Sequence, residues 1–120
     1  MKWHYRTSDL EGAALDWAVA KALGVAVQYD RMNKWYETSN PAYAEPCDGP
    51  IVFSPSADWE QGGPIIEREG ITLRNYIMGD QWDAELEPNL ESGPTPLVAA
   101  MRCYVASKLG DEITIPEELR

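Results

Sequence analysis

The residues that could do chemistry gather between positions 53 and 70, a segment that reads FSPSADWEQGGPIIEREG. Its serines and prolines break an extended chain, and Asp58 is a residue type that caps helices. Adjacent glycines beside a helix start can present backbone N–H groups to an anion, and a nearby guanidinium can pair with it. A tryptophan can stack on a planar ring. The segment therefore predicts a ligand-binding site made of Ser54, Ser56, Trp59, Gly62, Gly63 and Arg68.

These residues also have a structural interpretation. The glycine pair would let a helix pack closely on its neighbour, and Trp59 would anchor the core. Arg102, a further candidate ligand-binding residue, interrupts an apolar helical pattern. It could pair with an acid at the edge of the core such as Glu67, or it could face a ligand phosphate. From the sequence, both interpretations remain open.

No complete catalytic set accompanies this segment. His4 is the single histidine, so a hydrolytic triad is poorly supported. Acid pairs such as Glu67 and Glu69 follow from the abundance of acids. The alternating acids at 83, 85 and 87 would share a strand face and could attract a hard cation, although a solvated face is the commoner outcome. We expect no catalysis, no cofactor and no bound metal.

The composition predicts one globular domain, residues 1–120, with an acidic surface. Hydrophobic residues make up 44% of the chain, but no run approaches the roughly 20 apolar residues of a membrane span. The beginning, MKWHYRTSDLEG, lacks the apolar centre of a secretion signal, so we expect a cytoplasmic protein. A formal net charge of -10 argues against binding to duplex nucleic acid and allows an acidic surface for a basic partner.

Cys47 and Cys103 are expected to be free thiols, because two distant cysteines form neither a disulfide framework nor a typical metal motif. Cys103 falls in an apolar helical pattern and should be buried, whereas Cys47 falls in a proline-rich loop. One of the five tryptophans could serve a homodimer interface.

Helices are predicted at 9–23, 58–69 and 96–109. Ser8 and Glu11 form a capping-box pattern before the first, and Gly24 supplies a left-handed stop. Thr95 is a capping residue and Pro96 suits the first turn of the last helix. The last helix presents one core-facing stripe, formed by Leu97, Ala100, Met101, Tyr104 and Val105.

Strands are predicted at 25–30, 32–38 and 113–115, a weaker one at 51–53, and a hairpin from 71–78 and 81–86. The stretches 39–50 and 89–94 are rich in turn-forming residues and are predicted to be loops. The fold class that follows is α+β, a small antiparallel sheet packed with about three helices in the manner of an α-β-α sandwich.

Three blocks of the sequence resemble a known family. They read EGAALDWAVAK, SPSADWEQGGPIIEREG and GPTPLVAAMRCYVASKLGDE, and together they cover about half the chain. They are similar to the phage NinX family, small bacteriophage and prophage proteins of unknown function. The SPS turn, the hairpin with a tryptophan and the alanine-rich last helix also resemble a broader phage α-β-α sandwich domain. Neither resemblance implies an activity or catalytic residues.

The resemblance and the missing catalytic set together suggest a non-catalytic phage accessory protein in the host bacterial cytoplasm. We expect it to sequester a small anionic or nucleotide-like ligand. The alternative is an acidic interaction module, or a mimic of nucleic acid, that binds a basic host protein.

Overall fold

The structure is a computed structural model, and it describes residues 3–25, 27–29, 35–37, 53–75 and 81–115. The helices are α1 (Gly12–Leu23), α2 (Trp59–Glu69) and α3 (Pro96–Leu109), with a short 3-10 turn at Thr7–Asp9. The strands are β1 (Trp3–Arg6), β2 (Val27–Tyr29), β3 (Trp35–Glu37), β4 (Thr72–Asn75), β5 (Trp82–Leu86), β6 (Asn89–Gly93) and β7 (Glu112–Ile115). Within the described ranges, no helix has the length and apolar character needed to cross a membrane.

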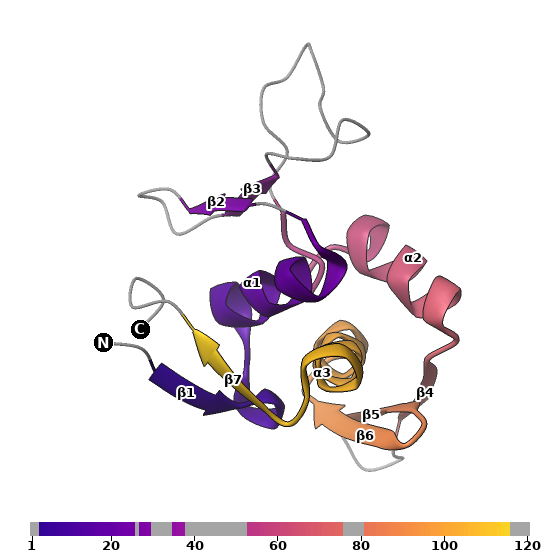
Figure 1. Cartoon of the computed structure of the whole chain (residues 1–120). Coiled ribbons are helices and arrows are strands. Elements are labelled where there is room, and N and C mark those ends of the chain that lie inside the picture. Colours follow the sequence, from indigo (N-terminus) through magenta and orange to yellow (C-terminus); the bar gives the residue numbers. More distant parts are fainter. Residues whose placement is uncertain (1–2, 26, 30–34, 38–52, 76–80, 116–120) are drawn as a thin grey trace.

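Helix α3 is the centre of the molecule, with α1 and α2 on one side and β5 and β6 on the other (Figure 1). The predicted single core-facing stripe understates the burial of α3, because the helix is buried around most of its circumference. Its buried residues are Leu97, Ala99, Ala100, Met101, Cys103, Tyr104, Val105 and Ala106. A helix that is apolar all round becomes a central layer instead of a surface layer. The layer between the other elements is therefore a helix, where the sandwich expectation placed a sheet.

Strands β4, β5 and β6 form an antiparallel sheet that packs against α3. Ala84 of β5 lies opposite Leu73 on one side and Glu91 on the other, and it is fully buried. The predicted hairpin is confirmed by the pairing of β4 with β5. The predicted loop at 89–94 is wrong, since Asn89–Gly93 is a strand. Pairing with β5 and packing on α3 outweigh the weak strand propensity of NLESG.

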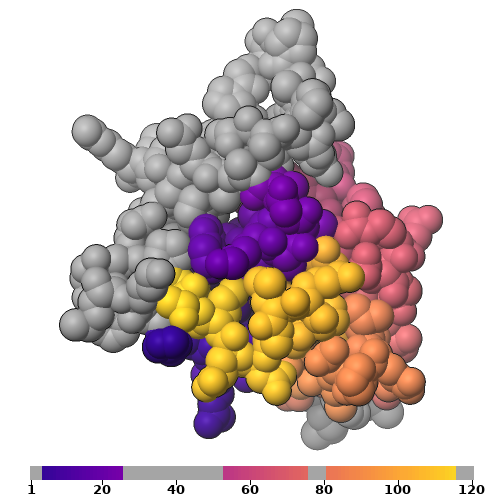
Figure 2. All heavy atoms as spheres, in the orientation of Figure 1, coloured from indigo at the N-terminus to yellow at the C-terminus, as the bar shows by residue number. Residues whose placement is uncertain are grey.

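Strands β1 and β7 join the two ends of the described chain in an antiparallel pair, from Trp3 opposite Ile115 to Arg6 opposite Glu112. The corresponding indigo and yellow segments lie side by side in Figure 2. The strand at 113–115 is confirmed, whereas β1 was not predicted. Its four residues are a strand because β7, more than 100 positions later in the chain, supplies the hydrogen bonds.

The capping box predicted for the first helix is wrong. Thr7 is buried, its N–H donates to the carbonyl of Asp111, and its hydroxyl donates to the carbonyl of Gly110 at 2.6 Å. These bonds hold residues 7–9 in a 3-10 turn, so the helix begins only after Glu11. The stop is confirmed, because Gly24 adopts a left-handed φ of 76°.

The other two helices agree with the sequence. The Asp58 carboxylate accepts the N–H of Glu60 at the start of α2, and the Thr95 hydroxyl accepts the N–H of Val98 at the start of α3. Gly70 and Gly110 end these helices. Three helices with antiparallel strands confirm the α+β class, although the described strands divide among three small sheets.

Several predictions concern residues outside the described ranges. The strands at 25–30 and 32–38 are confirmed where they are described, as β2 and β3, which pair with each other. The loop at 39–50, with Cys47, lies outside the described residues, as do most of the strand at 51–53 and the turn of the hairpin. Phe53 is described, and it is buried without regular structure.

Candidate functional site

The turn before α2 is held by its own hydrogen bonds. The Ser54 carbonyl accepts the N–H groups of Ala57 and Asp58, and the Ser54 N–H donates to the Gln61 amide oxygen at 2.8 Å. The Asp58 carbonyl in turn accepts the N–H of Gln61. Ser54 is therefore engaged on its backbone in closing the turn, which fixes the direction in which α2 leaves it.

Ser56 connects this turn to α1 through a buried carboxylate. Its N–H donates to Oδ1 of Asp16 at 2.9 Å, and both residues are only 7% exposed. Burial raises the pKa of the Asp16 carboxyl to about 6, while hydrogen bonds from the side chain and the backbone of Ser56 act in the opposite direction. Asp16 is thus a buried acid whose hydrogen-bonding partner is Ser56.

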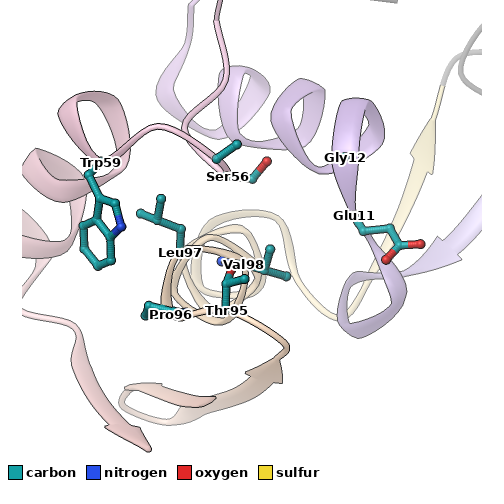
Figure 3. Close-up of a pocket in the computed structure, with 9 residues that line it drawn as sticks. Glu11, Gly12, Ser56, Trp59, Thr95, Pro96, Leu97 and Val98 are labelled. Carbon is teal, nitrogen blue, oxygen red and sulfur yellow. Dashed lines mark hydrogen bonds between the residues drawn. The ribbon is translucent and has the colours of Figure 1, made fainter. Parts of the chain in front are cut away.

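A cleft of about 680 Å³ opens where the first turns of α1, α2 and α3 approach one another. We call it the helix-start cleft. Figure 3 shows Trp59 and Glu11 on opposite sides of the beginning of α3, with Ser56 between them. Its lining residues are Glu11, Gly12, Ser56, Ala57, Trp59, Thr95, Pro96, Leu97 and Val98.

Trp59 supplies the large aromatic surface of the helix-start cleft. It is the first residue of α2 and is 55% exposed, so the prediction of a core anchor is wrong for this tryptophan. Gly63 follows one turn later, and a Cβ at that position would lie 3.9 Å from Cε3 of the indole. The missing side chain of Gly63 leaves space beside this edge of the indole, although Gly63 itself does not line the cleft.

The electrostatic character of the cleft comes from helix ends and one acid. The Glu11 side chain makes no capping hydrogen bond to α1, whereas Thr95 caps α3 through Val98. The N-terminal ends of helices carry partial positive charge. Neither lysine nor arginine is among the nine lining residues, and the Glu11 carboxylate is at the rim. An anionic group would therefore rely on backbone N–H groups for its attraction.

Gly62 is a packing residue. A Cβ at this position would lie 2.6 Å from Cδ2 of Leu97 and closer still to the carbonyl oxygen of Pro55. Its N–H already donates to the carbonyl of Asp58 at 2.9 Å. The close-packing interpretation is therefore confirmed for Gly62, which seats α2 against α3 and the preceding turn.

The two arginines among the predicted residues lie elsewhere. Arg68 is near the end of α2, exposed, and donates from Nε to Glu69 at 2.9 Å. Arg102 of α3 donates from Nε to the carbonyl of Leu10 at 2.7 Å and from Nη1 to the carbonyl of Ser92 at 2.8 Å. The suggested pairing of Arg102 with Glu67 is wrong. Arg102 connects α3 to the residues before α1 and to β6.

A second, polar groove of about 430 Å³ is formed by segments distant in sequence. It is lined by Arg6, Ser8, Glu91, Asp111 and Glu112, and we call it the acidic groove. Burial raises the pKa of the Glu91 carboxyl, the charge of Asp111 adds to the increase, and the charge of Arg102 opposes it. Negative charge is therefore concentrated where β6 meets the turn before β7.

The acids expected to share a strand face do so in part. Asp83 accepts a hydrogen bond from the Ser92 hydroxyl at 2.9 Å, and Glu85 pairs with Arg74 at 2.8 Å. Glu87 lies beyond the end of β5. Among the described residues, no group of three or more potential ligands could hold a metal ion.

Of the predicted site residues, the helix-start cleft brings together only Ser56 and Trp59. The sequence did not single out Asp16 or the first turn of α3 as parts of a site. Asp16 did leave a signal, since it is the one charged residue between Glu11 and Lys21 in an otherwise apolar helix. A carboxylate in such a position must either leave the core or find a partner inside it.

Comparison with known proteins identifies a family. The family model described as "Bacteriophage P22, NinX" matches residues 6–108. A search of curated proteins finds no match. The matched range includes the whole helix-start cleft and most of the acidic groove.

Proposed function

Because the chain belongs to the bacteriophage P22 NinX family, we propose that this phage accessory protein acts by binding, without catalysis, in the cytoplasm of the host. Its ligand is a small nucleotide-like molecule that carries a planar ring and an anionic group. The helix-start cleft is where this ligand is sequestered. The observation that carries the proposal is the exposed Trp59 indole beside a 680 Å³ cleft formed by three helix starts.

The chemistry of the cleft supports this ligand class. A planar base can stack on an exposed indole, an interaction worth about 1–3 kcal/mol per base in proteins that bind single-stranded nucleic acid. The beginning of α1 carries partial positive charge that can attract a phosphate. The Ser56 and Thr95 side chains are further polar groups on the lining. The cleft is also large enough for a small ligand.

A melting-temperature screen tests the proposal. The panel contains mononucleotides and cyclic oligonucleotides at saturating concentration, and a ligand of the native state raises the melting temperature. Trp59→Ala should weaken a binding nucleotide about tenfold or more while leaving stability nearly unchanged, since the side chain is largely exposed. Leu90→Ala is the matched control, because Leu90 is similarly exposed and does not line the cleft.

Two outcomes would contradict the proposal. One is a panel without any melting shift, and the other is a shift that Trp59→Ala leaves intact. Arg68→Ala adds a discriminating measurement, because Arg68 does not line the cleft and should leave nucleotide affinity unchanged. Light scattering of wild type and Trp59→Ala would show whether this tryptophan instead serves a homodimer.

The acidic groove favours a second candidate function, the binding of a basic host protein. Glu91, Asp111 and Glu112 place carboxylates around one groove in a chain of net charge -10. Such a surface attracts Lys and Arg side chains, and the attraction falls as salt rises. Asp111→Lys with Glu112→Lys should abolish capture of a basic partner at low salt. Glu60→Lys with Glu67→Lys, exposed acids on α2, is the matched control.

A further inference from the structure

The contact between Asp16 and Ser56 joins the interior of the molecule to the wall of the helix-start cleft. Asp16 belongs to α1 and is nine-tenths buried, whereas Ser56 lies 40 positions later and lines the cleft. The ionised carboxylate accepts both the N–H and the hydroxyl of Ser56. The same turn leads directly into the Asp58 cap of α2, and so to Trp59.

We propose that Asp16 is the positioning residue of the helix-start cleft, whose ionised carboxylate fixes the Ser56 wall in the arrangement that accepts a ligand. The inference rests on the proposed function of this cleft. It adds that ligand affinity depends on the protonation state of Asp16, a residue that does not contact the ligand. Protonation removes acceptor capacity from Asp16, which releases one Ser56 donor and loosens the wall.

The charged side chains on the elements around Asp16 each have another partner or are exposed. On α3, Arg102 is bound to the carbonyls of Leu10 and Ser92, and Lys108 pairs with Glu69. Asp58, in the turn, accepts hydrogen bonds from Glu60 and Gln61. On α1 itself Lys21 lies over the ring of Trp17, and on β7 Glu112 is exposed. Among the described side chains, burial and Ser56 are therefore what determine its pKa.

The first measurement needs no ligand. In nitrogen-15 NMR spectra, the Ser56 amide of the wild type should titrate with a midpoint near pH 6, the pKa expected for Asp16. The amides of Ala57 and Trp59 should follow the same curve, because the turn moves as a unit. In Asp16→Asn all three curves should be flat between pH 5 and 7.5. If only the Ser56 amide titrates, the carboxylate does not control the cleft wall and the proposal is overturned.

The second measurement uses 3′,5′-cyclic AMP, because its phosphodiester and its base keep their charge over this pH range. The wild type should bind it about fivefold more tightly at pH 7 than at pH 5, the worth of roughly one hydrogen bond. Asp16→Asn, which keeps an acceptor for the Ser56 N–H, should show no such difference, and Asp16→Ala should bind more weakly at both pH values.

The two measurements separate the inference from the proposed function. Cyclic AMP that does not bind, together with a cooperative titration of the cleft amides, would contradict the proposed ligand class and support the role of Asp16. Binding of cyclic AMP with equal affinity at pH 5 and pH 7 would support the function and overturn the role of Asp16.

Discussion

Gly62 of α2 lies against the backbone carbonyl of Pro55, in a space too small for a Cβ. The neighbouring glycine, Gly63, has no such contact, and a Cβ there would meet only the Trp59 ring at an ordinary van der Waals distance. Close packing therefore requires glycine at position 62, whereas position 63 has room for a side chain.

This difference predicts opposite effects of the same substitution. Gly62→Ala should lower the free energy of unfolding by about 1–3 kcal/mol, because the added methyl group forces α2 away from Pro55 and Leu97. Gly63→Ala should raise it by about 0.5–1 kcal/mol, since alanine is the better helix former. Urea unfolding of the pair provides the measurement. Equal effects of the two substitutions would contradict the packing described for Gly62.

The buried acid predicts a pH dependence of stability. An unfolded Asp ionises near 3.8, and folded Asp16 keeps its proton up to about pH 6. The folded state therefore binds more protons between these values, so Asp16 makes the protein less stable as pH rises through this window, by about 3 kcal/mol. The loss is nearly complete roughly one pH unit above the folded pKa.

Asp16→Asn removes this loss. The variant should match the wild type near pH 4 and exceed its free energy of unfolding by about 2–3 kcal/mol at pH 7, as measured by urea unfolding across the range. Asp9→Asn is the control, because Asp9 is exposed. A gap between Asp16→Asn and wild type that stays constant with pH would show that Asp16 ionises equally well in both states.

Arg102 is predicted to matter for stability. Arg102→Met would leave the carbonyls of Leu10 and Ser92 without their charged donor and should cost about 3 kcal/mol in urea unfolding. Arg74→Met is the matched control, since Arg74 pairs with Glu85 at an exposed site and should cost less than about 1 kcal/mol. If Arg102→Met instead kept full stability and lost nucleotide binding, the earlier phosphate-facing interpretation would be correct.

The Cys103 thiol should be inert in the native protein. It is fully buried, and burial raises its pKa to about 11, so the reactive thiolate is scarce at neutral pH. Labelling with a maleimide, followed by mass spectrometry of the peptide that contains Cys103, should proceed only as fast as the protein unfolds. Rapid labelling in the absence of denaturant would show that α3 is more accessible than its packing indicates.

The sequence determined the local structure wherever a local rule applies. Asp58 and Thr95 accept backbone N–H groups two or three residues away, and Gly24 and Gly70 stop their helices through their own left-handed backbone. Such features depend on neighbours along the chain, so the helix ends at these positions could be predicted. The three family blocks are also local strings, and the family match confirms what they indicated.

The tertiary structure decided everything that depends on distant partners. Residues 9–11, expected in the first helix, lie outside α1 because Thr7 bonds to Gly110 and Asp111. Asn89–Gly93 is a strand because it pairs with β5 and packs against α3. The same holds for the candidate site. The sequence grouped Arg68 and the glycines with Trp59 because they are close along the chain. Folding kept Ser56 with Trp59, added the first turn of α3 and buried Asp16 behind them, since packing determines which side chains meet.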